Sequence, residues 1–348
     1  MSSEPSSHRI FIERLVIAII VVGIALLLWN LRGLFMLVFG AVLVSVILNI
    51  LAEPIEERLG LPRWAALLAA VLVVAGGLGF SFWIFGAQVA RQADALTDMV
   101  PAAWAALQSR LDSWGMGEAV REWSATLSGG GGVVANLGNI AVRVGNGIAD
   151  TLLVIVGGIY LAAQPELYRV GTIKLVPERG RALAAQALDA SARALRLWLL
   201  GRLVSMATVG ALTWLGLSII GVPSALALGL LAALLEFVPF IGPIVAAVPA
   251  ILLAFAGSPQ AALLTAGLFL AIQQFEGNVL EPLVQQRAVD LPPALLLFAL
   301  VAGGLVFGIV GIILAAPFTV VLFVMVKRLY VQEALNTATP LPGQEKRG

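Results

Sequence analysis

Long apolar runs are the feature that most limits the folds open to this chain. Three of them lie in its first quarter, at residues 15–29, 34–51 and 64–87, and further runs follow after residue 148. A membrane-spanning helix needs about 20 apolar residues, whereas a transmembrane barrel strand alternates over about 10 residues. Because the runs are long and do not alternate, the sequence predicts an all-α, polytopic transmembrane helical bundle.

The overall composition agrees with a membrane protein and argues against most enzyme classes. Only 12% of the residues are charged, whereas soluble domains carry about 25%. Cysteine is absent and the one histidine, His8, lies in the polar start of the chain, so cysteine or histidine nucleophiles and thiolate metal sites are excluded. No phosphate-binding loop or His-Glu-x-x-His motif is present. We expect no enzyme activity, no cofactor, no metal site and no nucleic-acid partner.

The first half of the chain divides at its polar segments. Residues 1–87 are expected to form three spans; a signal peptide is the alternative for the first, but no cleavage site follows it. Residues 88–147 place apolar residues at helical spacing and predict an external amphipathic insertion, as a structural cap or a binding domain. Residues 148–202 predict a fourth span and a basic amphipathic helix on the cytoplasmic leaflet.

The remaining residues are expected to form a transport core at 203–335 and a disordered tail at 336–348. Orientation follows from the segment 165–202, which holds seven Lys or Arg residues. Cytoplasmic loops are enriched in Lys and Arg. This rule predicts a multi-pass protein with both the N- and C-terminus in the cytoplasm and the lipid bilayer as its first partner.

A polar interruption at Glu236–Pro243 breaks the apolar C-terminal half. Pro239 and Pro243 each remove a backbone donor, and Gly242 allows unusual backbone angles between them. The pattern predicts a broken helix whose freed backbone groups are available to a solute. Glu236 lies beside the break, and an ionisable residue in a membrane segment suggests a functional site; the alternative is that it reaches an interface and is solvated.

The length of the segment 223–257 leaves its topology open. It can cross the membrane once as a broken helix or form a re-entrant hairpin. Two segments of the chain are weakly similar to each other, and this similarity bears on the choice. Phe240–Pro249 and Gly308–Pro317 share residues at four offsets: Ile241/Ile309, Ile244/Ile312, Ala247/Ala315 and Pro249/Pro317. Paired interrupted helices form the solute site in many transporters, and chance is the alternative explanation.

A second polar island follows at 273–282. On a regular helix Gln274, Asn278 and Glu281 share a face, while Gln273 and Glu276 can reach each other. Such a face binds a polar solute, a cation or a proton, unless these are ordinary loop residues. We expect Glu236 or the 237–243 backbone to lie near this island, so that the two form one path, lined by Glu236, Pro239, Gly242, Pro243, Gln273, Gln274, Glu276, Asn278, Glu281 and Pro282.

Several motifs in order make the chain resemble the AI-2E family of bacterial transporters, also called UPF0118. They are Tyr160-Leu161, Leu199-Leu200-Gly201-Arg202-Leu203, Gly221-Val222-Pro223, Phe237–Pro243, Gln274-x-Glu276-x-Asn278-x-Leu280-x-Pro282 and Val289-x-Leu291-Pro292-Pro293. The resemblance implies eight spans in the inner membrane and a homo-oligomer. Many relatives carry Gln at the position of Arg202, a possible gate, and His at that of Pro292.

The resemblance also implies the function. Family members are described as exporters of the quorum-sensing signal autoinducer-2, and some relatives as sodium(lithium)/proton antiporters. Three hypotheses therefore stand: a bacterial exporter of a small polar, autoinducer-2-like solute, a Na⁺(Li⁺)/H⁺ antiporter, and a membrane scaffold that transports nothing.

Overall fold

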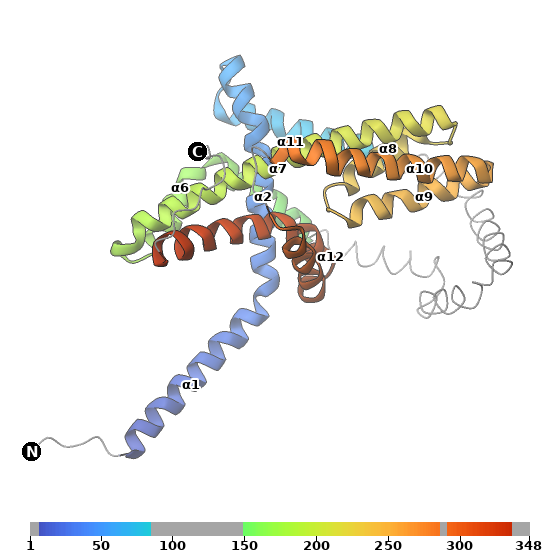
Figure 1. The fold of residues 1–348 in the computed structure, drawn as a ribbon. Helices are drawn as coiled ribbons and strands as arrows, with labels where there is room; N and C mark the ends of the chain where they lie inside the picture. The colour runs from blue at the N-terminus through green and yellow to red at the C-terminus, as the bar shows by residue number, and fades with distance from the viewer. Residues whose placement is uncertain (1–6, 85–148, 286–290, 336–348) are drawn as a thin grey trace, which may run out of the picture.

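The computed structural model describes residues 7–84, 149–285 and 291–335, and every regular element in these ranges is helical (Figure 1). The predicted all-α class is confirmed. Within these ranges four helices are long and apolar enough to cross a membrane, and a bent pair adds a fifth candidate. They are Arg32–Leu59, Arg63–Ile84, Glu178–Ile220, Pro293–Glu333 and the pair Ala149–Ala163 with Pro165–Lys174. The predicted insertion at 88–147 lies outside the described residues.

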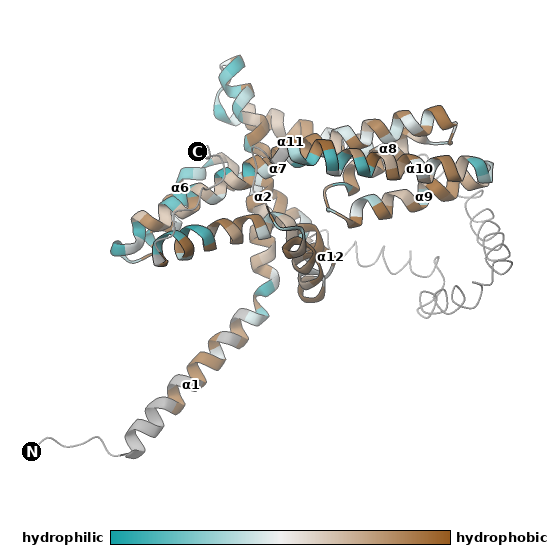
Figure 2. Ribbon diagram, in the orientation of Figure 1, coloured by the Kyte–Doolittle hydropathy of each residue, from teal (hydrophilic) through white to brown (hydrophobic). Residues whose placement is uncertain are grey.

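The N-terminal helices pack through small residues. Helix α1 (Ser7–Asn30) extends away from the rest of the molecule, and α2 (Arg32–Leu59) begins at its end (Figure 1). Beyond α1, α2 packs against the helices Arg63–Ile84 and Ala149–Ala163. Alanines allow these helices to approach closely, and the shared cluster consists of Leu48, Ala52, Ala66, Leu67, Ala70 and Ala162. Hydrophilic residues are concentrated at several places, among them the far end of α2 and helix α6 (Pro165–Lys174) (Figure 2).

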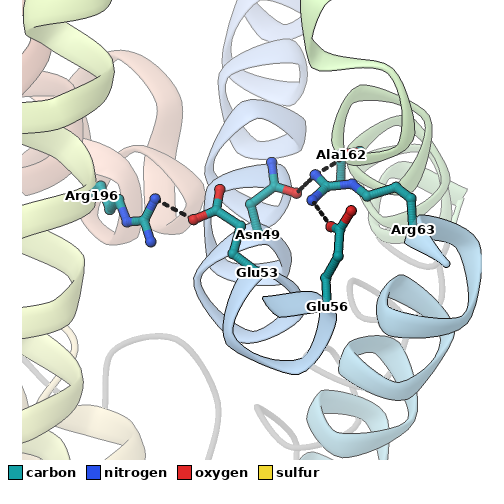
Figure 3. A network of polar contacts seen from close by, with 6 residues as sticks. All are labelled: Asn49, Glu53, Glu56, Arg63, Ala162 and Arg196. Atoms are coloured by element: carbon teal, nitrogen blue, oxygen red, sulfur yellow. Dashed lines mark hydrogen bonds and ion pairs between the residues drawn. The ribbon is translucent and has the colours of Figure 1, made fainter. Parts of the chain in front are cut away.

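A polar network ties this N-terminal part to the rest (Figure 3). The Arg63 guanidinium donates to Glu56 at 2.9 Å, to Asn49 at 2.6 Å and to the carbonyl of Ala162 at 3.1 Å. One turn along α2, Glu53 pairs with Arg196 of helix α7 (Arg181–Ile220) at 2.5 Å. The end of α2 is thereby joined to three other helices.

Arg63→Leu is expected to lower the free energy of unfolding by about 1–3 kcal/mol, because three acceptors lose one charged donor. Thermal unfolding of the purified protein in detergent measures this change. Arg58→Leu is the matched control, because Arg58 lies in the last turn of α2, five residues before Arg63, and its side chain is exposed. Equal midpoints for the two variants would contradict a bridging role for Arg63.

Helix α7 (Arg181–Ile220) is the axis of the C-terminal part and runs for 40 residues. The basic amphipathic segment and the start of the predicted transport core therefore lie in one continuous helix, and the predicted boundary at 202/203 falls inside it. Helix α6 (Pro165–Lys174) is held against its start by two hydrogen bonds of 2.7 Å from Arg169 to Asp189. A shared cluster joins α7 to α2 and α12, formed by Met36, Leu43, Ile50, Leu195, Leu199 and Leu314.

The segment 225–257 is a helical hairpin. Helices α8 (Ala225–Leu235) and α9 (Ile241–Gly257) run side by side, α8 packs against α7, and α10 (Pro259–Phe275) follows and contacts both α9 and α7 (Figure 1). At 1.5 Å per residue α8 spans about 16 Å, well short of the ~30 Å hydrocarbon core. The structure thus adopts the hairpin rather than a single broken crossing. Its arms share a cluster that includes Leu228, Ala232, Ala246, Ala250 and Ala254.

Helix α12 (Pro293–Val326) contains a second reversal at Gly308, where φ is 65° and ψ is −144°. The two arms touch closely, since a Cβ added at Gly311 would lie 2.0 Å from the carbonyl oxygen of Gly303. In the first hairpin Phe240, with φ 65°, precedes Ile241 in the same way that Gly308 precedes Ile309. The two similar segments, Phe240–Pro249 and Gly308–Pro317, therefore each lie at the start of the second arm of a hairpin.

Candidate functional site

The site begins at the tip of the first hairpin. Helix α8 ends at Leu235, and α9 begins at Ile241 after Phe240, whose φ of 65° is rare for a bulky residue. Such a conformation costs about 1–3 kcal/mol and is found most often at functional sites. Position 242 has no room for a side chain, because a Cβ there would lie 1.9 Å from the carbonyl oxygen of Leu235.

Three backbone donors of the tip are satisfied within the tip itself. Val238 donates to the carbonyl of Leu235 at 3.0 Å, Ile241 to that of Pro239 at 2.8 Å, and Gly242 to that of Val238 at 2.9 Å. The expectation that freed N–H groups face a solute is therefore wrong for these residues, because the tight turn uses them. The chemistry of this site comes from side chains.

Three charged side chains meet beside the tip. Arg202 Nη2 on α7 lies 2.7 Å from Glu236 Oε1, and Arg202 Nη1 lies 3.4 Å from Glu276 Oε1. Arg202 Nε also donates to the carbonyl of Phe237 at 3.4 Å, and Gln273 donates to Glu276 Oε2 at 2.9 Å. One guanidinium thus joins the hairpin tip to the second polar island, where the two islands were expected to meet.

These side chains line a cavity of ≈ 210 Å³. It lies between α7, the tip, the end of α10 and the start of α12. Its polar lining comes from Arg202, Glu236, Glu276 and neighbours, and its apolar lining from α7, the tip and α12. The lining residues are Trp198, Gly201, Arg202, Ser205, Glu236, Pro239, Phe240, Pro243, Gln273, Glu276, Gly277, Glu281, Leu291 and Leu296.

Among the described residues of the ion cluster, the carboxyl groups outnumber the cations. The side chains of Arg202, Glu236 and Glu276 are only 12%, 1% and 15% exposed, so water screens them weakly. Two carboxylates share one guanidinium, and neither oxygen of Glu236 receives an aligned hydrogen bond. A buried charge without full compensation is costly. The cluster can therefore accept a proton, a cation or a hydrogen-bond donor.

The structure sorts the predicted path residues into two groups. Six of the ten line the cavity, as does the possible gate Arg202: Glu236, Pro239, Pro243, Gln273, Glu276 and Glu281. Gly242 packs behind the tip, and Pro282 lies outside the lining. Gln274 and Asn278 are exposed and bond to each other at 3.1 Å. Among the described residues no group of His, Cys, Asp and Glu gathers as a metal site.

The π-helical turn η2 (Glu276–Leu280) explains the division of the second island. A π turn holds more residues than an α turn, so it rotates the face of everything that follows. Glu281 consequently joins Gln273 and Glu276 at the cavity, and the predicted common face of Gln274, Asn278 and Glu281 is wrong. Such turns often mark functional sites.

Sequence reasoning missed three α7 residues of the lining, Trp198, Gly201 and Ser205, although a signal was present for two of them. Trp198, Arg202 and Ser205 stand at positions i, i+4 and i+7, which face the same side of a helix. Had Arg202 been placed inside α7, this spacing would have added Trp198 and Ser205. Phe240 also lines the cavity, and nothing in its sequence context distinguishes it from the apolar residues around it.

Comparison with known proteins identifies the family to which the chain belongs. The AI-2E family transporter model matches residues 15–330. YrrI of Bacillus subtilis, classed by its name with transport proteins, is 28% identical over 305 residues, covering 83% of this chain and 85% of YrrI. The AI-2 transport protein TqsA of Escherichia coli is 30% identical over 189 residues, covering 53% of this chain and 54% of TqsA. The match covers nearly the whole chain, which therefore belongs to the AI-2E transporter family.

Proposed function

We propose that this protein exports a small polar solute across the bacterial cytoplasmic membrane by a path through the Arg202–Glu236–Glu276 cavity. The observation that carries the proposal is this buried ion cluster at the tip of a hairpin in an otherwise apolar bundle. Charged residues in a membrane protein's interior are costly and mark solute or ion pathways. Membership of a transporter family supports the same reading.

Autoinducer-2 is the first candidate solute, because TqsA is named for its transport. A polyhydroxylated molecule can donate hydrogen bonds to Glu236 and Glu276 and accept them from Arg202 or Gln273. The positive-inside rule supports an inner-membrane protein with both termini in the cytoplasm. A homo-oligomer is proposed on the family resemblance alone.

A Na⁺(Li⁺)/H⁺ antiporter is the second candidate. It is favoured by one observation, the two carboxylates that share Arg202, since such groups can exchange a proton for a cation. Sodium- or lithium-dependent proton movement in everted vesicles tests this function, and its absence across several pH values removes it. The third candidate is a scaffold that transports nothing and holds another subunit.

Glu276→Gln is expected to lower autoinducer-2 efflux from proteoliposomes at least about tenfold, because an amide cannot pair with Arg202 as a carboxylate does. Initial efflux rates at matched protein amounts measure the effect, and exposed Arg58→Gln is the control. Asn278→Ala tests whether the path also uses the outer face of the second island. Full efflux in Glu276→Gln would reject the cavity as the path, and no efflux in the wild type would favour the other two candidates.

A further inference from the structure

We infer that the cavity selects a small organic cation, whose ammonium group binds Glu236 in competition with the tethered guanidinium of Arg202. The inference rests on the proposed function, since it takes the cavity to be the transport site. It keeps this path but differs from the autoinducer-2 candidate in the chemical class of the solute, which it takes to be a positively charged amine rather than a polyhydroxylated molecule. Three observations support it: the charge of the cluster, an unpartnered oxygen, and the aromatic lining.

The cluster contains more carboxyl groups than cations. Glu236 and Glu276 place two carboxyl groups against the single guanidinium of Arg202, and all three side chains are at least 85% buried. When both carboxyl groups are ionised, this excess attracts cations and repels anions strongly in a weakly screened interior. A carboxylate or phosphate solute would add to the imbalance, whereas one ammonium group would neutralise the cluster.

Glu236 also presents an oxygen with no partner. Its side chain is 1% exposed, and among the described residues no N–H group donates to its Oε2 atom. Buried polar atoms are almost always paired, so an exception requires an explanation. The residue lines the cavity, and a ligand there that donates N–H groups would supply the missing partner.

The rest of the lining suits an organic rather than an inorganic cation. Trp198 and Phe240 line the cavity with Leu291 and Leu296, and aromatic rings attract ammonium groups while packing against methylene groups. The volume of ≈ 210 Å³ equals about seven water-sized groups at roughly 30 Å³ each. A short alkylamine or diamine of about six non-hydrogen atoms matches both the size and the mixed lining.

Arg202 occupies the place that this cation would take. Its N–H groups already face Glu236 and Glu276, at 2.7 and 3.4 Å, so it acts as a competitor attached to the protein. A bound ammonium must share these carboxylates or displace the guanidinium. Removing the guanidinium should therefore strengthen the binding of an organic cation, whereas removing the Glu236 charge should abolish it.

Thermal unfolding of the purified full-length protein in detergent tests the inference with three probes of similar size: 1,4-diaminobutane, 1,4-butanediol and succinate. Sodium chloride at equal ionic strength controls for general salt effects. We expect only the diamine to raise the unfolding midpoint, because a ligand stabilises the state that binds it. Glu236→Gln should lose this shift, and Arg202→Gln should reach half of it at about tenfold lower diamine concentration. Arg196→Gln, on the same helix but outside the cavity, should show the same diamine-induced shift as the wild type, measured from its own midpoint without ligand.

Each outcome decides between specific alternatives. An equal shift with butanediol, sodium or succinate would overturn the selection of an organic cation while leaving the proposed path intact. A diamine shift that persists in Glu236→Gln would place the binding elsewhere and overturn the inference. If Arg202→Gln does not yield folded protein, the comparison of wild type with Glu236→Gln still decides. Absence of any shift overturns the inference, and absence of efflux for every solute tested removes the proposed function as well.

Discussion

Arg202→Met is expected to lower the free energy of unfolding by about 3–5 kcal/mol, one of the two largest effects that the structure predicts. The substitution keeps most of the volume but leaves Glu236 and Glu276 buried without their cation. Removing one partner of a buried ion pair typically costs this much, because the remaining charge is uncompensated. Efflux should fall as well, since the cluster joins both halves of the cavity.

A double-mutant cycle measures this effect. Glu236→Gln is introduced alone and together with Arg202→Met, and thermal or denaturant unfolding in detergent is compared for all four proteins. The double variant should recover at least half of the loss, because one of the two uncompensated charges is gone. Additive losses, with no recovery, would mean that Arg202 and Glu236 do not interact in the folded protein.

Gly242→Ala is the second large effect, with an expected cost of about 3 kcal/mol. The added Cβ would lie 1.9 Å from the carbonyl oxygen of Leu235, which belongs to the backbone and cannot rotate away. Overpacking costs about 1–3 kcal/mol even where side chains can adjust, so this contact lies at the upper end. The tip would shift and move Glu236 away from Arg202, and efflux should be lost.

Gly267→Ala is the matched control for this substitution. Gly267 lies within α10, and nothing stands within 4 Å of the position that a Cβ would take. An exposed helical position gains up to about 1 kcal/mol from Gly to Ala, so the unfolding midpoint should stay or rise slightly. Similar midpoints for both variants in detergent would show that the tip is not closely packed.

Much of the fold could be predicted because its determinants are local. Long apolar runs predict spanning helices, and the interruption between Leu235 and Pro243 predicts the end of one helix and the start of another. Gly308 opens the segment that resembles Phe240–Pro249 and is the point where α12 reverses. The hairpin geometry could not be predicted, because sequence shows where α8 ends but not the direction in which α9 leaves. That direction depends on how Ala232 packs against α9 and α10.

The candidate site was predicted in part for a similar reason. Glu236 and Glu276 stand out because charged residues are rare in apolar sequence, and Gln273 lies within one helical turn of Glu276. The bond between Arg202 and both carboxylates could not be predicted, since 34 residues or more separate Arg202 from either partner. The π turn at 276–280 could not be predicted either, because no feature of this sequence distinguishes it from a regular helix.

Labelling at Ser205 tests most directly whether solute passes through the cavity. Because the sequence contains no cysteine, the Ser205→Cys variant carries a single thiol, and this thiol lies in the lining of the cavity. We expect a small thiol reagent to modify this residue, solute to slow the modification, and the modified protein to lose efflux. Ser218→Cys, on the exposed face of α7, should be modified without loss of efflux. Full efflux after complete modification of Ser205→Cys would contradict a transport path through the Arg202–Glu236–Glu276 cavity.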